Sequence, residues 1–209
     1  MAQDDVGERF WITAEGDVSI KYEAEVEIQR TASDLASMAE VSKTDLPGDA
    51  TQYLFDSHFC AAQTFQSFVG DEFGGLSGGA RVAAMRDWIA EHFTYSPGAS
   101  GPQTTARDSF VSRRGVCRDY AHVMVALSRA AGIPARYVSA YAPDVTPQDF
   151  HAVAEVFLEG GWVLVDATGM AEPQETAVIG VGRDAAEVSF LTSFGYVEFS
   201  GHTVEVNRN

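Results

Sequence analysis

Apolar and polar residues alternate near the N-terminus in the pattern of a β-strand with one solvated face. The clearest case is residues 21–28 (KYEAEVEI), where apolar side chains alternate with lysine and glutamate. Weaker strand patterns cover residues 9–14 and 52–60, and residues 33–41 fit either a short helix or an irregular crossing. We therefore predict a small β-rich region over residues 1–72.

Helical spacing replaces this alternation after a stretch at residues 70–79 that holds five glycines and is predicted to be a connection. Apolar residues recur every three or four positions over residues 80–93, which predicts an amphipathic helix. A second, short helix is predicted after Thr104 or Thr105, because Asp108 lies at the spacing of a capping box.

The third predicted helix starts near residues 115–117 and is the most apolar of the three. It runs to Ala131, where Gly132 and the nearby Pro134 end it, and its wide apolar face places it at the centre of a core. The strands predicted after this helix span residues 135–142, 151–158, 162–167, 177–181, 187–191 and 196–206. Helices followed by a run of strands indicate an α+β core over residues 73–209.

The net charge of −16, from 30 acidic and 14 basic residues, restricts the partners of the chain. A surface this negative repels phosphate backbones, so nucleic acid is excluded as a partner. No apolar run approaches the roughly 18 residues of a membrane-spanning helix. The acidic start of the chain does not have the pattern of a secretory signal, so a cytoplasmic location is expected by default. Nothing in the sequence indicates an oligomeric state.

Cys117 lies in the run Gly-Val-Cys-Arg-Asp-Tyr, in the first turn of the central helix. The helix dipole and the free amides at this end both favour the thiolate, which is the nucleophilic form of cysteine. The same amides can bind an oxyanion. Cys60 lies among alanine and phenylalanine residues and is interpreted as a small core residue, so both thiols are expected to be unpaired.

His151 and Asp166 can supply a base and its orienting acid. His151 opens one predicted strand and Asp166 closes the next. If Phe157 pairs with Trp162 in a hairpin, Asp166 lies opposite Val153 and is the diagonal neighbour of His151, about 7–8 Å away at the backbone. A tight turn made of the two glycines in the connection would shift this register and separate the pair. With the predicted register, the acid can orient an imidazole that takes the thiol proton.

The other histidines are weaker candidates. His122 lies about 140° around the helix from Cys117, so it is interpreted as a packed helix residue. His92 ends a helix, and His58 and His202 have no acidic partner at a useful spacing in the sequence. There is no HExxH motif, phosphate-binding glycine loop or acidic cluster with calcium-ligand spacing, so no metal or other cofactor is expected.

Three runs of residues together resemble one known family. These are RRGVCRDYAHVMVALSRAAGIPARYVSAY at 113–141, HAVAEVF at 151–157 and GGWVLVDAT at 160–168. Their order and spacing resemble the transglutaminase-like superfamily, whose bacterial branch is often described as cysteine proteases. The resemblance implies a papain-like α+β core, with the catalytic cysteine at the N-terminus of a central helix packed on an antiparallel sheet.

The resemblance also implies roles for individual residues. It makes Cys117, His151 and Asp166 a catalytic triad, with Cys117 forming a thioester to an acyl group. The family's second oxyanion donor comes from upstream of the cysteine, where Gln103 and Tyr95 are the candidates. The chain departs from the family pattern at two positions: Val153 replaces the usual tryptophan, and Ala167 replaces the usual proline. The resemblance therefore does not define the shape of the cleft wall.

The function expected from these residues is thiol-dependent attack on a carboxamide or peptide bond. Transfer of the acyl group to water makes a cysteine protease or amidase, and transfer to a primary amine makes a transglutaminase. The substrate is then a peptide or protein. The alternative is a non-catalytic transglutaminase-like domain that binds peptides or proteins.

Overall fold

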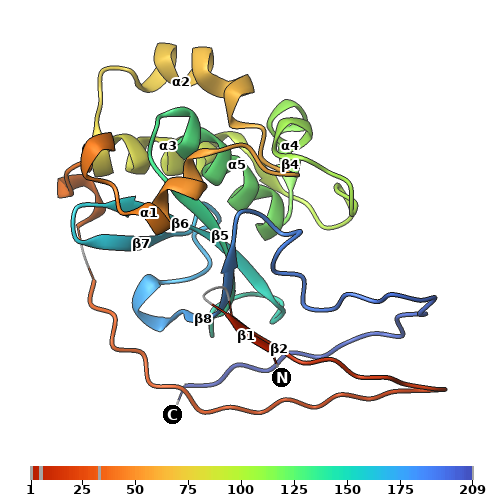
Figure 1. Cartoon of the computed structure of the whole chain (residues 1–209). Coiled ribbons are helices and arrows are strands. Elements are labelled where there is room, and N and C mark those ends of the chain that lie inside the picture. Colours follow the sequence, from red (N-terminus) through yellow and green to blue (C-terminus); the bar gives the residue numbers. More distant parts are fainter. Residues whose placement is uncertain (1, 5–6, 33, 209) are drawn as a thin grey trace.

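Four antiparallel strands form the central sheet in the order β7-β6-β5-β8. The structure is a computed structural model that describes residues 2–4, 7–32 and 34–208 of the chain (Figure 1). The sheet strands are β5 (Ala135–Tyr141), β6 (His151–Leu158), β7 (Gly161–Val165) and β8 (Ala177–Gly182). All four lie where the sequence pattern predicts a strand, to within two residues at each end.

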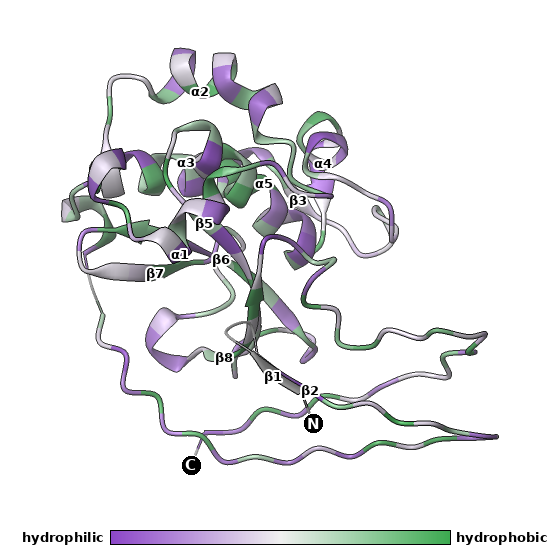
Figure 2. Cartoon of the chain, viewed as in Figure 1, coloured by the Kyte–Doolittle hydropathy of each residue, from purple (hydrophilic) through white to green (hydrophobic). Residues whose placement is uncertain are grey.

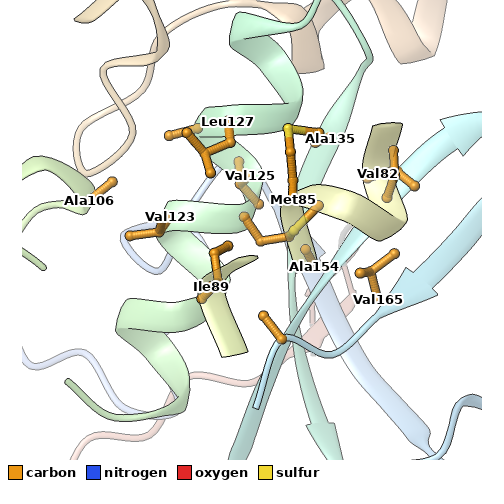
Figure 3. Close-up of a cluster of buried hydrophobic side chains, with 14 of the residues drawn as sticks. Val82, Met85, Ile89, Ala106, Val123, Val125, Leu127, Ala135, Ala154 and Val165 are labelled. Atoms are coloured by element: carbon orange, nitrogen blue, oxygen red, sulfur yellow. The ribbon is translucent and has the colours of Figure 1, made fainter. Parts of the chain in front are cut away.

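Helix α5 (Cys117–Ala130) packs on this sheet and is almost completely buried, as its apolar pattern predicts. Helices α2 (Gln66–Phe73), α3 (Gly78–His92) and α4 (Ala106–Ser112) surround it, and α1 (Gly48–Thr51) is a single turn. Figure 3 shows Met85 and Ile89 of α3 close to Val123 and Val125 of α5, with Ala154 of the sheet below. The predicted α+β architecture, with a central helix packed on an antiparallel sheet, is therefore confirmed.

Capping residues set the ends of these helices. Thr105 Oγ1 accepts the Asp108 N–H at 3.3 Å while Asp108 Oδ2 accepts the Thr105 N–H at 2.9 Å, so the predicted capping box starts α4. Gly132, with φ 77°, ends α5 in the left-handed region that glycine adopts at low cost.

Arg129 joins segments from both ends of the chain to α5. Its guanidinium is buried and donates to the carbonyl oxygens of Ala135 at 2.9 Å, Phe55 at 3.0 Å and Arg183 at 2.6 Å, and to Ser57 Oγ at 3.0 Å. Because these bonds satisfy a guanidinium that is removed from water, this arginine stabilises the packing of these segments.

The glycine-rich stretch 70–79 is not the single connection that its composition predicts. Helix α2 continues to Phe73 and α3 already begins at Gly78. A Cβ on Gly79 would lie 1.7 Å from the Leu35 carbonyl oxygen, so this glycine permits close packing of α3 against an earlier segment. Composition alone does not distinguish a glycine used for close approach from one used in a loop.

The prediction of a β-rich N-terminal region is wrong in its strands. Residues 21–28 are extended but belong to no sheet among the described residues, and Tyr22 and Val26 are 74% and 62% exposed. The observed strands are β1 (Ala2–Asp4) and β2 (Gly7–Arg9), so only Arg9 of the predicted strand 9–14 is paired. Alternation makes a strand possible, but a strand needs a partner with which to exchange hydrogen bonds.

Short helices replace the other N-terminal predictions. Gln52–Leu54, inside the predicted strand 52–60, is a 3₁₀ turn, and so is Leu35–Ser37 within the ambiguous segment 33–41. Phe65 and Val69 from this region are buried in the same cluster as α3 and α5. The division of the chain into residues 1–72 and 73–209 stays a prediction.

The last two predicted strands, 187–191 and 196–206, are also absent from the sheets of the described residues. Figure 1 shows this part of the chain running as an extended segment below the sheet, and Figure 2 shows apolar residues along it. Phe194 is 86% and Tyr196 95% exposed, and Phe194 contacts Trp11 of the N-terminal segment with ring centres 5.7 Å apart. Across the described residues, no helix has the length and apolarity needed to cross a membrane.

Candidate active site

Cys117 is the first residue of α5, as predicted, and its thiol is partly accessible. The chain reaches it through β4 (Arg114–Gly115), which pairs in parallel with β3 (Thr94–Tyr95). Val116 has extended backbone angles, φ −111° and ψ −177°, so the helix begins abruptly at the cysteine. The thiol therefore lies beside the free amides of the first helical turn.

The hairpin of β6 and β7 brings His151 and Asp166 together. Phe157 pairs with Trp162, which is the register that the sequence argument requires. The turn consists of Glu159 and Gly160, because the next pair is Leu158 with Gly161, so the alternative register does not form. His151 Nε2 lies 2.9 Å from Asp166 Oδ2, with the two side chains 0% and 5% exposed.

The second ring nitrogen of His151 faces the cysteine side of the site. Burial lowers the pKa of His151, but the hydrogen bond to Asp166 and the nearby Cys117 thiol outweigh it and raise the pKa to about 9. Nδ1 is buried and has no hydrogen-bond partner among the described residues. The Cys117 sulfur also lies 4.0 Å from the carbonyl oxygen of Phe150, the residue before His151. The structure thus brings all three residues of the predicted triad together.

Asp166 is held as a carboxylate by donors from the segment that follows it. Oδ1 accepts the N–H and hydroxyl of Thr168 at 2.8 and 2.7 Å, while Oδ2 accepts the N–H groups of Met170 and Ala171 at 3.1 and 2.9 Å. Burial raises the pKa of Asp166, but these bonds and His151 lower it below its ordinary value. Thr168 was not predicted to have a role, although a threonine two residues after an aspartate is a recognisable turn signal.

The two candidate oxyanion donors lie in different settings. Burial and the adjacent Cys117 raise the pKa of Tyr95 to about 12, although a hydrogen bond from the Cys117 N–H lowers it. Tyr95 is therefore a protonated phenol beside the nucleophile. Gln103 is exposed in the loop between β3 and α4, and no hydrogen bond links it to Cys117 among the described residues. A buried tyrosine that the sequence did not single out, Tyr137, also packs near Cys117.

His122 and Cys60 are core residues, as the sequence analysis concludes. His122 is fully buried, stacks on Phe59 with ring centres 5.1 Å apart, and accepts the Ala185 N–H at 3.2 Å. Burial lowers the pKa of His122 to about 4 and raises the pKa of Cys60 to about 12. Both groups are therefore neutral at physiological pH, and both cysteines are free thiols.

His202 differs from its sequence-based interpretation. It lies 2.6 Å from Asp149, although the two residues are far apart in the sequence. Its ring also lies near Phe150 and Phe190, with ring centres 5.3 and 6.0 Å away. Long-range pairing of this kind follows from the path of the C-terminal segment and has no local signal. No group of three or more metal-binding side chains occurs among the described residues.

A cysteine at the start of a central helix, facing a histidine and an aspartate on a neighbouring hairpin, defines a transglutaminase-like thiol site on a papain-like core. Residues 69–167, which contain all three side chains, match the family model of the transglutaminase-like superfamily. This part of the chain is a transglutaminase-like domain.

Individual relatives agree with this assignment. A solved structure described as a "putative cysteine protease" from Cytophaga hutchinsonii is 39% identical, with a TM-score of 0.70 over 73% of this chain and 53% of that one. An uncharacterized protein of Mycobacterium leprae is 35% identical over 54% of this chain and 43% of its own length. A protein-glutamine gamma-glutamyltransferase of Pseudomonas aeruginosa is 36% identical over 44% of this chain and 16% of its own length. The chain thus spans less than half of these two curated relatives.

Proposed function

We propose that this chain is a thiol enzyme that cleaves or transfers acyl groups at carboxamide or peptide bonds through Cys117, His151 and Asp166. The observation that carries the proposal is the 2.9 Å contact of His151 with Asp166 beside a partly accessible thiol at a helix start. Relatives named as a cysteine protease and as a glutamyltransferase support this class of chemistry.

In the first half-reaction, the Cys117 sulfur attacks the carbonyl carbon and forms a C–S bond. His151 takes the proton of the thiol for this step, and a pKa of about 9 favours the protonated imidazole at neutral pH. The tetrahedral intermediate collapses when His151 donates this proton to the leaving nitrogen and the C–N bond breaks. Ammonia or an amine leaves, and a thioester remains on Cys117.

The oxyanion of that intermediate needs donors that are already in place. The backbone N–H of Cys117, which donates to the Tyr95 hydroxyl oxygen in the structure, supplies one donor when it turns to the oxyanion. For the second, we favour Tyr95 over Gln103, because Tyr95 stays protonated and contacts Cys117 while Gln103 is exposed to solvent.

In the second half-reaction, an acceptor attacks the thioester while His151 takes its proton. Water as acceptor gives a carboxylic acid and completes hydrolysis, while a primary amine gives a new amide. We favour hydrolysis, because water needs no dedicated acceptor site. The protein works on peptide or protein substrates in this proposal, and its cytoplasmic location stays a prediction.

The test is turnover of glutamine-containing peptides and of unfolded casein, with and without a primary amine such as cadaverine. Ammonia release, peptide fragments and amine incorporation are measured separately, so that amidase, protease and transglutaminase activities are distinguished. We expect the wild type to release ammonia or fragments without the amine.

Two alanine variants make the test specific for the thiol. Cys117→Ala should abolish turnover, and Cys60→Ala should retain it, because Cys60 is buried in the core away from His151. Turnover by Cys117→Ala at the wild-type rate would refute the proposed nucleophile. Peptide binding without turnover in either protein would favour the non-catalytic alternative.

A further inference from the structure

Asp119, two residues after Cys117, is a buried carboxylate with an unusual set of partners. Its side chain is 0% exposed. Oδ2 accepts the Val116 N–H at 2.8 Å and the Ser100 hydroxyl at 2.5 Å. One oxygen thus joins the first turn of α5 to the loop 96–103, which lies between β3 and α4.

Arg118 completes this connection from the neighbouring position. Its Nη2 donates to the Gly101 carbonyl oxygen at 2.6 Å and lies 3.3 Å from Asp119 Oδ1. Two consecutive residues that directly follow the nucleophile therefore hold two consecutive residues of the loop, Ser100 and Gly101.

Gly115 leaves the space that this arrangement needs. A Cβ at residue 115 would lie 2.5 Å from Asp119 Cβ and 2.6 Å from Oδ2, so a larger residue would displace the carboxylate. Gly115 also pairs with Tyr95 in the short parallel ladder, and its carbonyl accepts the Ser96 N–H at 2.8 Å. The loop is thus fixed at its start by Gly115 and in its middle by Asp119.

Electrostatics alone does not explain a carboxylate at this position. A negative charge two residues from a thiolate disfavours the thiolate, and an N-cap role needs only one accepted bond. The hydroxyl of Ser100 is a partner from a distant segment, and Arg118 links Asp119 to the Gly101 carbonyl oxygen, neither of which a cap requires. A geometric role accounts for all three contacts.

We propose that Asp119 is a positioning residue for Cys117: it fixes the loop 96–103, and with it Tyr95, against the first turn of α5. The inference rests on the proposed function, since it assigns the loop 96–103 and Tyr95 to the side of the site that faces the thioester on Cys117. Fixing this wall keeps the Cys117 amide and the Tyr95 hydroxyl in place before an oxyanion forms.

The test measures the alkylation rate of Cys117 with iodoacetamide at pH 7 in Asp119→Ala, Asp119→Asn and Ser100→Ala. We expect Asp119→Ala to slow alkylation by about tenfold, because the displacement of the site outweighs the gain from removing a negative charge near the thiol. Asp119→Asn keeps an acceptor for the Val116 N–H and should recover most of the rate. Ser100→Ala should slow alkylation and increase hydrogen–deuterium exchange of the loop 96–103.

Asp108→Ala is the matched control, because Asp108 occupies the same capping position in α4 and is exposed. It should reduce the melting temperature yet leave the Cys117 alkylation rate within about twofold. A wild-type alkylation rate in folded Asp119→Ala would overturn the proposal, as would equal slowing by Asp108→Ala.

If Asp119→Ala does not fold, the result for Ser100→Ala tests the proposal, since this substitution removes only one hydroxyl from the loop. Unchanged alkylation and unchanged loop exchange in Ser100→Ala would overturn the proposal. Alkylation and exchange need no substrate, so a wild-type protein without peptide turnover would count against the proposed function and leave this test intact.

Discussion

Replacement of Asp166 by asparagine should change how the stability of the protein depends on pH. Folding raises the pKa of His151 from 6.5 to about 9, so the folded state binds this proton more tightly than the unfolded state. The resulting stabilisation is complete below pH 6.5 and is lost as the pH rises through about 9. Asp166 makes the largest contribution that raises this pKa, and asparagine carries no charge to replace it.

The size of the effect follows from the same difference in pKa. A rise from 6.5 to about 9 corresponds to about 3 kcal/mol, which is an upper limit for the part that Asp166 supplies. In a domain of this length, that free energy changes the melting temperature by roughly 6–12 °C. In Asp166→Asn, burial remains and only Cys117 still raises the pKa of His151, so this pH-dependent stabilisation should be largely lost.

The assay is thermal unfolding followed by circular dichroism between pH 6 and pH 9.5. This range avoids titration of Asp166 itself, whose pKa is lowered and whose contribution is lost only in acid. The melting temperature of the wild type should fall more steeply over the range than that of Asp166→Asn. Thr168→Val is the control, because it keeps the ion pair and loses one hydroxyl donor, which costs about 1 kcal/mol at every pH. Parallel curves for wild type and Asp166→Asn would refute the reasoning.

Two further substitutions test other parts of the account. Folding lowers the pKa of the buried His122, so the wild type should lose up to about 3 kcal/mol of stability as the pH falls from 6.5 to about 4. His122→Phe should remove this loss. Urea unfolding at pH 4.5 and 7 measures this, and equal pH effects in both proteins would contradict it. Arg129→Met should cost about 3 kcal/mol at neutral pH, since it leaves the carbonyl oxygens of Ala135, Phe55 and Arg183 without this donor. An unchanged urea midpoint would show that these bonds contribute no net stability.

The parts of the fold that the sequence predicts are those with strong local signals. Helix α5 combines a wide apolar face with Gly132 at its end, and the hairpin of β6 and β7 has apolar strands around a short glycine turn. The register of that hairpin follows from its turn length, and it alone places His151 next to Asp166. The contact of His151 with Asp166 was therefore predictable once the register was correct.

The parts that the sequence does not predict depend on contacts between distant segments. Residues 21–28 alternate like a strand, but no neighbouring strand pairs with them among the described residues. Gly79 is needed because Leu35 packs against it, which no local pattern indicates. Asp119 has a partial signal, since it lies three residues after the helix cap, but its bond to Ser100 appears only in the folded chain.

The most direct test of the central claim compares alkylation of the two cysteines in the native wild-type protein. Iodoacetamide is applied at pH 6, and peptide mass spectrometry reports the labelling rate of each thiol. Cys117 should react at least about 100-fold faster than Cys60, because a helix start and a protonated His151 favour its thiolate while Cys60 is buried with a pKa of about 12. Equal and slow labelling of both thiols would contradict the assignment of Cys117 as the nucleophile.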